Sequence, residues 1–195
     1  MNGEPTRRSL IPPLLIALLF VGPLIIAAWL YYAGQDWQPT GRSNYGLLLE
    51  PIVNLNEQPG TAPLTILTGD ASDGRWVLLY VNRSACDSSC ETALYRLRQA
   101  RLMLGNDMHR VIRVFLHGNA APDRVFLDEN HPGLITTNEA GLGELLDARR
   151  PAGSAPGGLY LVDPLGNLVM YFPAALDPGQ MVDDIEHLLE LSHIG

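Results

Sequence analysis

The first apolar segment of the chain is long and uninterrupted. Residues 10–33, LIPPLLIALLFVGPLIIAAWLYYA, contain no charged side chain. About 20 consecutive apolar residues span the core of a bilayer, so this pattern predicts a transmembrane helix. A cleaved signal peptide is the alternative, but its apolar core is usually only about 7–15 residues long. We therefore expect an uncleaved anchor, with residues 1–9 before it and a polar linker over 34–44.

The residues on either side of this segment indicate its orientation. Arg7 and Arg8 precede it, whereas Asp36 follows it closely. Basic residues favour the cytoplasmic side of a membrane, so the N-terminus is expected in the cytoplasm and the rest outside it. This predicts a single-pass protein of a bacterial inner membrane whose C-terminal domain lies in the periplasm.

After the linker, apolar runs alternate with helical patterns. Residues 76–81, WVLLYV, form a continuous apolar run, as expected for a strand buried on both faces. Residues 88–104 follow a helical pattern, in which Ser88 and Glu91 have the spacing of a capping box. The other predicted elements are strands over 46–50, 111–116, 159–162 and 168–172, helices over 138–149 and 178–192, and a hairpin turn over 163–167.

The order of these elements predicts an α/β fold. A strand, a helix and a second strand in one sheet should form a parallel unit with a right-handed crossover. The last two strands should form an antiparallel pair. We interpret residues 45–195 as one thioredoxin-like domain with an additional N-terminal strand.

The composition excludes several classes of function. All 13 basic residues are Arg, so the chain has no Lys nucleophile. The formal net charge of −8 argues against a nucleic acid as partner. Two Cys cannot form a four-Cys zinc site. The sequence also lacks a Ser-His-Asp pattern, a Gly-rich phosphate loop and a zinc-protease motif.

The two cysteines carry most of the chemical signal. Cys86 and Cys90 follow a predicted strand directly and open a predicted helix. A helix N-terminus favours the thiolate, which attacks disulfides and binds soft metal ions. The pair can therefore be a Cu(I) site, a redox-active dithiol or a structural disulfide. A disulfide that closes so short a loop adds little chain-entropy stabilisation, which weakens the structural interpretation.

The stretch WVLLYVNRSACDSSC and the later stretch GLYLVDPLGNLVMYFP resemble the Sco family, membrane-anchored thioredoxin-fold copper chaperones for cytochrome c oxidase. The resemblance implies that Cys86 and Cys90 bind copper, as Cu(I) or Cu(II). It also implies a cytochrome c oxidase subunit or another copper-assembly protein as partner. The alternatives are a thiol–disulfide oxidoreductase that maintains a partner's copper-binding cysteines, and a membrane-tethered binding module without chemistry.

The chain departs from the Sco pattern at the third copper ligand. The family places a His before the hairpin strand, at a position that corresponds to Ala155, but residues 150–158 contain no His. His117 is the best-placed substitute, because it ends a strand expected beside the one leading to Cys86. Together with the two cysteines it could complete a three-ligand site; the alternative is a solvated His at a strand end.

Two weaker signals surround the cysteines. Pro156 stands close to the position where thioredoxin-like proteins often carry a cis-proline, and an ordinary loop proline is the alternative. Four arginines could form an electropositive surface near the cysteines, or simply a solvated helix face. These arginines are Arg83, Arg96, Arg98 and Arg101.

Overall fold

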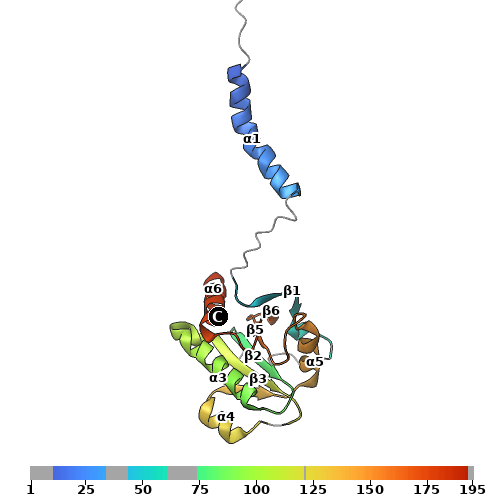
Figure 1. Cartoon of the computed structure of the whole chain (residues 1–195), viewed down its shortest axis with the longest axis vertical. Coiled ribbons are helices and arrows are strands. Elements are labelled where there is room, and N and C mark those ends of the chain that lie inside the picture. The colour runs from blue at the N-terminus through green and yellow to red at the C-terminus, as the bar shows by residue number, and fades with distance from the viewer. Residues whose placement is uncertain (1–10, 34–43, 61–73, 121, 193–195) are drawn as a thin grey trace, which may run out of the picture. The chain divides into compact units, whose positions relative to one another are not determined.

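The computed structural model describes residues 11–33, 44–60, 74–120 and 122–192. The chain divides into two compact units between Ser43 and Asn44. The first contains helix α1 (Ile11–Ala33), and the second contains all the other elements (Figure 1). Within the described residues, no helix has the length and apolar character needed to cross a membrane. The anchor expected over residues 10–33 is therefore unconfirmed and stays a prediction.

A six-stranded mixed sheet forms the centre of the second unit, in the order β1-β6-β5-β2-β3-β4. Strand β2 pairs in parallel with β3, and β3 pairs in parallel with β4. The remaining neighbours are antiparallel, including the β5–β6 hairpin. The predicted parallel unit and closing hairpin are both confirmed. The strands are β1 (Leu47–Asn54), β2 (Trp76–Asn82), β3 (Val111–His117), β4 (Leu134–Thr137), β5 (Leu159–Val162) and β6 (Asn167–Phe172).

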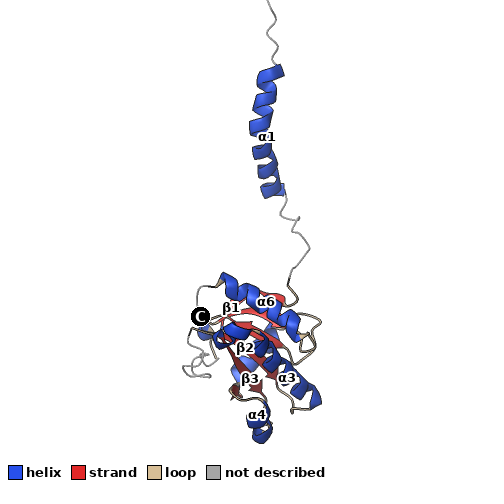
Figure 2. Ribbon diagram, turned by 90° about the vertical axis from the view of Figure 1, so that its left-hand side faces the viewer, coloured by secondary structure: helices blue, strands red, loops and turns tan. Residues whose placement is uncertain are grey.

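Helices cover both faces of this sheet. Helices α3 (Ser88–Met103) and α6 (Pro178–Leu191) pack on one face (Figure 2). Helix α5 (Ala140–Arg149) packs on the other face. Residues of β2 alternate between the two cores, and its first six are all buried. This explains why β2 is a continuous apolar run rather than an alternating one.

Two short elements were not predicted. Helix α4 (Arg124–Asn130) has seven residues, too few to show a helical hydrophobic period. Strand β4 has four residues and follows the loop pair Pro132-Gly133, so this region has the pattern of an irregular connection. Two short 3₁₀ turns, η2 (Leu55–Glu57) and η4 (Gly105–Arg110), complete the fold.

A buried carboxylate ties the start of the second unit to helix α6. The Asp184 side chain is 5% exposed. It accepts hydrogen bonds from the backbone N–H groups of Tyr45, at 3.2 Å, and Gly46, at 2.7 Å. These two residues directly precede β1, so Asp184 holds the edge strand against the helix that covers it.

Candidate functional site

The two cysteines meet at the carboxyl end of β2, where α3 begins. Their sulfurs are joined in a disulfide, and their Cα atoms are 5.1 Å apart. Cys90 lies in the first turn of α3 and is completely buried. Cys86 lies in the preceding loop and is only partly buried. A partner molecule can therefore reach the sulfur of Cys86 more easily than that of Cys90.

Asp87, which lies between the two cysteines, is the N-cap residue of α3. The sequence pattern did not predict this role. Its carboxylate accepts from the backbone N–H of Ser89, at 3.0 Å, and of Cys90, at 3.1 Å. It also accepts from the Ser89 hydroxyl at 2.6 Å. The predicted capping box at Ser88 and Glu91 is wrong, because the preceding Asp is itself a strong N-cap residue.

These hydrogen bonds stabilise the negative charge of the Asp87 carboxylate beside the disulfide. The Ser89 hydroxyl, together with the backbone N–H of Cys90, holds the pKa of the Asp87 carboxyl below its usual value. Asp87 is therefore ionised at neutral pH, one residue from Cys86. A negative charge disfavours a nearby thiolate, so Asp87 opposes the stabilisation that a helix N-terminus gives to a thiolate.

A cavity of about 290 Å³ lies beside the cysteine loop. Tyr80 and Asn82 from the end of β2 contribute to its lining, as do Pro156 and Gly157 from the loop before β5. Burial raises the pKa of Tyr80 to about 12, and the Asp87 charge adds to the effect, so the phenol stays protonated. The cavity thus places a neutral hydroxyl, an amide and a carboxylate near the disulfide.

Pro156 occupies this cavity as a trans-proline. Among the described residues, the only cis peptide bond is the one between Glu50 and Pro51. Pro156 is therefore not a cis-proline but the ordinary loop proline given as the alternative, and it lines the cavity together with residues of the cysteine loop.

His117 ends β3, beside Asn82 of β2, as the predicted strand order requires. Its Nδ1 lies 2.7 Å from the carbonyl oxygen of Gly118. The ring lines a separate cavity of about 90 Å³, which contains neither cysteine. Because both sulfurs are engaged in the disulfide here, His117 as a third ligand stays a prediction.

The loop before β5 supplies no His near the position at which the Sco pattern has one. At the corresponding position, the carbonyl of Ala155 accepts a hydrogen bond from the Tyr171 hydroxyl at 3.2 Å. Across the ranges that the structure describes, no cluster of three or more His, Cys, Asp or Glu side chains could hold a metal ion. In this disulfide-bonded form, the described residues bring no third side-chain ligand to the two cysteines.

The four arginines near the cysteines do not form one continuous basic surface. Arg83 forms an ion pair with Asp147 at 3.0 Å. Arg96 and Arg101 each donate a hydrogen bond to a backbone carbonyl. Arg98 lines a cavity on another side of α3. The expected electropositive surface is thus divided among separate contacts.

Comparisons with known proteins agree with this fold. The model of a family described as transmembrane-like, thioredoxin-like, C-terminal domain matches residues 76–192. No curated protein sequence matches the chain. Among solved structures, apo Sco1 from Thermus thermophilus is 20% identical, with a TM-score of 0.52, covering 74% of this chain and 96% of that one. Yeast Sco1 is 19% identical, with a TM-score of 0.50, covering 62% and 83%.

A redox protein is also similar in fold. The thioredoxin domain of a thiol–disulfide oxidoreductase from Bacteroides vulgatus is 15% identical, with a TM-score of 0.43. It covers 72% of this chain and 94% of that one. At these identities, the two Sco1 structures and the family model support the thioredoxin-like arrangement, and the chemistry must be argued from the residues.

Proposed function

Because the chain belongs to the family of transmembrane-like, thioredoxin-like C-terminal domains, we propose that it exchanges its disulfide with a cysteine pair of a partner protein. One observation carries the proposal: the Cys86–Cys90 disulfide joins a partly buried residue to a completely buried one. A cavity with polar lining lies beside it and can receive part of the partner. Because the two cysteines differ in burial, Cys86 attacks the partner and Cys90 resolves the mixed disulfide.

In the proposed reaction, the reduced protein transfers two electrons to a disulfide of the partner. The Cys86 thiolate bonds to one partner sulfur, and the other partner sulfur leaves as a thiolate. Cys90 then attacks the Cys86 sulfur, which re-forms the Cys86–Cys90 disulfide and releases the first partner sulfur. The proton from the Cys90 thiol passes to a partner thiolate. A dithiol donor then restores the reduced protein.

Copper transfer through the same cysteines is the second candidate, and the resemblance of the Cys-x3-Cys segment to the Sco family favours it. Two thiolates suit Cu(I), which would be cargo bound only to the reduced form. The absence of a His at the Ala155 position makes this candidate weaker than disulfide exchange. Cu(I) that binds tightly to the reduced chain, and is lost when both cysteines are changed to Ser, would support it.

The proposed setting is the periplasmic side of a bacterial inner membrane, with residues 10–33 as the anchor. The proposed partner is a cytochrome c oxidase subunit or another copper-assembly protein, whose cysteine pair must be reduced before copper can bind. A binding module without chemistry is the competing class. Such a module would keep its activity after both cysteines are changed to Ser.

Trapping a mixed disulfide tests the roles of the two cysteines. In the full chain, Cys90→Ser should form a stable mixed disulfide with glutathione at Cys86, because no second thiol resolves it. The matched variant, Cys86→Ser, should react at least about tenfold more slowly, since thiol exchange depends on access to the attacking sulfur. Mass spectrometry measures both rates. Equal rates for the two variants would overturn the assignment of Cys86 as the attacking thiol.

A further inference from the structure

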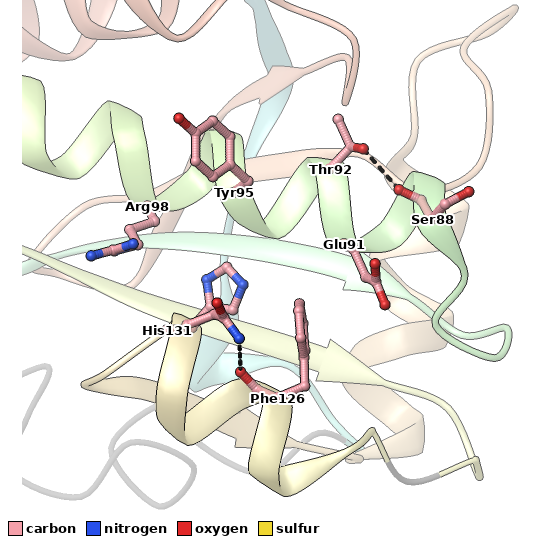
Figure 3. A pocket seen from close by; sticks show the side chains of 8 residues that line it. Ser88, Glu91, Thr92, Tyr95, Arg98, Phe126 and His131 are labelled. Carbon is pink, nitrogen blue, oxygen red and sulfur yellow. Dashed lines mark hydrogen bonds between the residues drawn. The ribbon is translucent and has the colours of Figure 1, made fainter.

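A second and larger cavity lies between helices α3 and α4 (Figure 3). Its volume is about 410 Å³, within the usual range for sites that bind small molecules. Tyr95 and Arg98 of α3 line one side of it. Phe126 of α4 and His131, the C-cap residue of α4, line the other side. Neither cysteine lines this cavity, so the inference drawn here does not depend on the proposed redox function.

Two side chains in this region carry buried polar atoms without hydrogen-bond partners in the described part of the chain: His131, which lines the cavity, and Arg113, which does not line it. His131 is 4% exposed, and its Nδ1 has no partner among the described residues. Arg113, on β3, is also 4% exposed. Its Nη2 donates to the Pro132 carbonyl at 2.7 Å, but within the same described ranges its Nε and Nη1 donate to nothing. Buried polar atoms without partners are rare in native proteins and point to a bound water or ion.

The charges around these atoms favour an anion. The Arg113 pKa is lowered to about 10, mainly by burial, so the guanidinium remains positive at neutral pH. Arg98 and Arg101 are close enough to lower it further. In the parts of the chain that the structure describes, none of these three arginines forms an ion pair with a carboxylate. The three guanidinium groups therefore add positive charge to this region that no direct ion pair within the described residues neutralises.

The arrangement of the lining narrows the choice of anion. Arg98 is close enough to His131 to act on its charge, and the two side chains lie near each other in the close-up view (Figure 3). Tyr95 and Phe126 offer aromatic surfaces in the same cavity. Glu91 also lines it and would repel a second negative charge. These features suit a ligand with a single negative charge and an apolar body.

We propose that this cavity binds a small monocarboxylate with an aromatic body. Its carboxylate accepts hydrogen bonds from Arg98 and from the His131 ring, in the field of the buried Arg113 guanidinium. Its ring packs against Tyr95 and Phe126. Arginine is well suited to this role, because its planar fork matches the geometry of a carboxylate.

Phenylacetate and its neutral isostere, phenylacetamide, provide the test. Each is titrated into the oxidised full chain in detergent, and binding is followed by calorimetry and by the shifts of the Tyr95 and His131 NMR signals. We expect saturable binding of phenylacetate and at least about tenfold weaker binding of the amide, because charge-assisted hydrogen bonds are lost. Equal binding of the two compounds would overturn the proposal. So would the absence of saturable binding, which would mean that water alone satisfies the buried atoms.

Arginine variants locate the carboxylate. Arg98→Gln should weaken phenylacetate binding about tenfold, since it removes one charged donor. Arg124→Gln is the matched control, because Arg124 is an exposed residue of α4 that does not line the cavity. It should leave binding unchanged. Equal affinities of the two variants for phenylacetate would contradict the assignment of Arg98. If a variant folds poorly, the comparison of phenylacetate with phenylacetamide on the unaltered chain still decides the proposal.

Discussion

At the scale of single residues, Asp87 sets the electrostatics of the disulfide. Its carboxylate caps α3 and is held ionised by the groups that donate to it. The negative charge stands between two sulfurs that must become thiolates to react. We infer that Asp87 makes the reduced pair less acidic than an uncharged cap would.

Substitution of Asp87 by Asn removes the negative charge and keeps a side chain that can cap α3. Asn is an equally good N-cap residue, so Asp87→Asn should preserve the start of α3. Loss of the charge should lower the pKa of the Cys86 thiol and speed its alkylation near neutral pH by roughly threefold. The measurement is the rate of iodoacetamide alkylation against pH for the reduced full chain. Unchanged pH profiles in the two proteins would show that Asp87 does not control the thiol.

The sequence could identify Cys86 and Cys90 but not the side chains around them. Their spacing and their place between a strand and a helix are local properties of the chain. Tyr80 and Asn82 end a strand whose pattern indicates only burial, so of these cavity-lining residues only Pro156 stood out from the sequence. The acidic residue between the two cysteines, Asp87, was the one available signal for the cap, because Asp is favoured at that position.

At the scale of elements, long-range contacts rather than local patterns fix the edge of the sheet. Strand β1 is held by pairing with β6 and by the contact of Asp184 with the residues before it. Helix α6 buries the apolar residues Met181, Val182, Ile185 and Leu189, and Asp184 is buried among them. Its partners lie 138 and 139 residues away, so no local pattern reports them.

Removal of this carboxylate should destabilise the domain. Asp184→Ala leaves two backbone N–H groups without their acceptor, and the expected loss in the free energy of unfolding is about 1–3 kcal/mol. Asp183→Ala is the matched control, since the neighbouring side chain is exposed and should change stability by less than about 0.5 kcal/mol. Urea denaturation of the full chain, followed by tryptophan fluorescence, measures both. A loss in Asp183→Ala as large as that in Asp184→Ala would contradict this account of the contact.

Element length also decided which parts of the fold were predictable. The buried strands β2 and β3 and the longer helices α3 and α6 carry enough residues to show a period. Their predicted bounds agree with the structure to within two residues. Helix α4 and strand β4 are too short for that test, and α4 forms one wall of the cavity that Arg98 and His131 line. The second site was therefore outside the reach of pattern analysis.

At the scale of the whole molecule, the chain combines a family fold with an altered site. In the strand order β1-β6-β5-β2-β3-β4, the carboxyl ends of β2 and β3 lie at the same end of the sheet as the start of β5. The cysteine loop, the end of β3 and the loop before β5 therefore lie at that end of the sheet. The loop before β5 contributes Pro156 and Gly157 to the cavity there, and residues 150–158 of this loop contain no His. The fold is shared with two Sco1 structures, and the function that we propose for this chain, disulfide exchange, rests on its own cysteine pair.

The central claim is that Cys86–Cys90 is a reversible redox centre, and its reduction potential tests this most directly. The oxidised full chain is equilibrated in buffers of reduced and oxidised glutathione, and free thiols are quantified by mass spectrometry after alkylation. We predict a reversible two-electron transition between about −270 and −120 mV, the range of proteins that exchange disulfides. A potential below about −300 mV, typical of structural disulfides, would contradict the account.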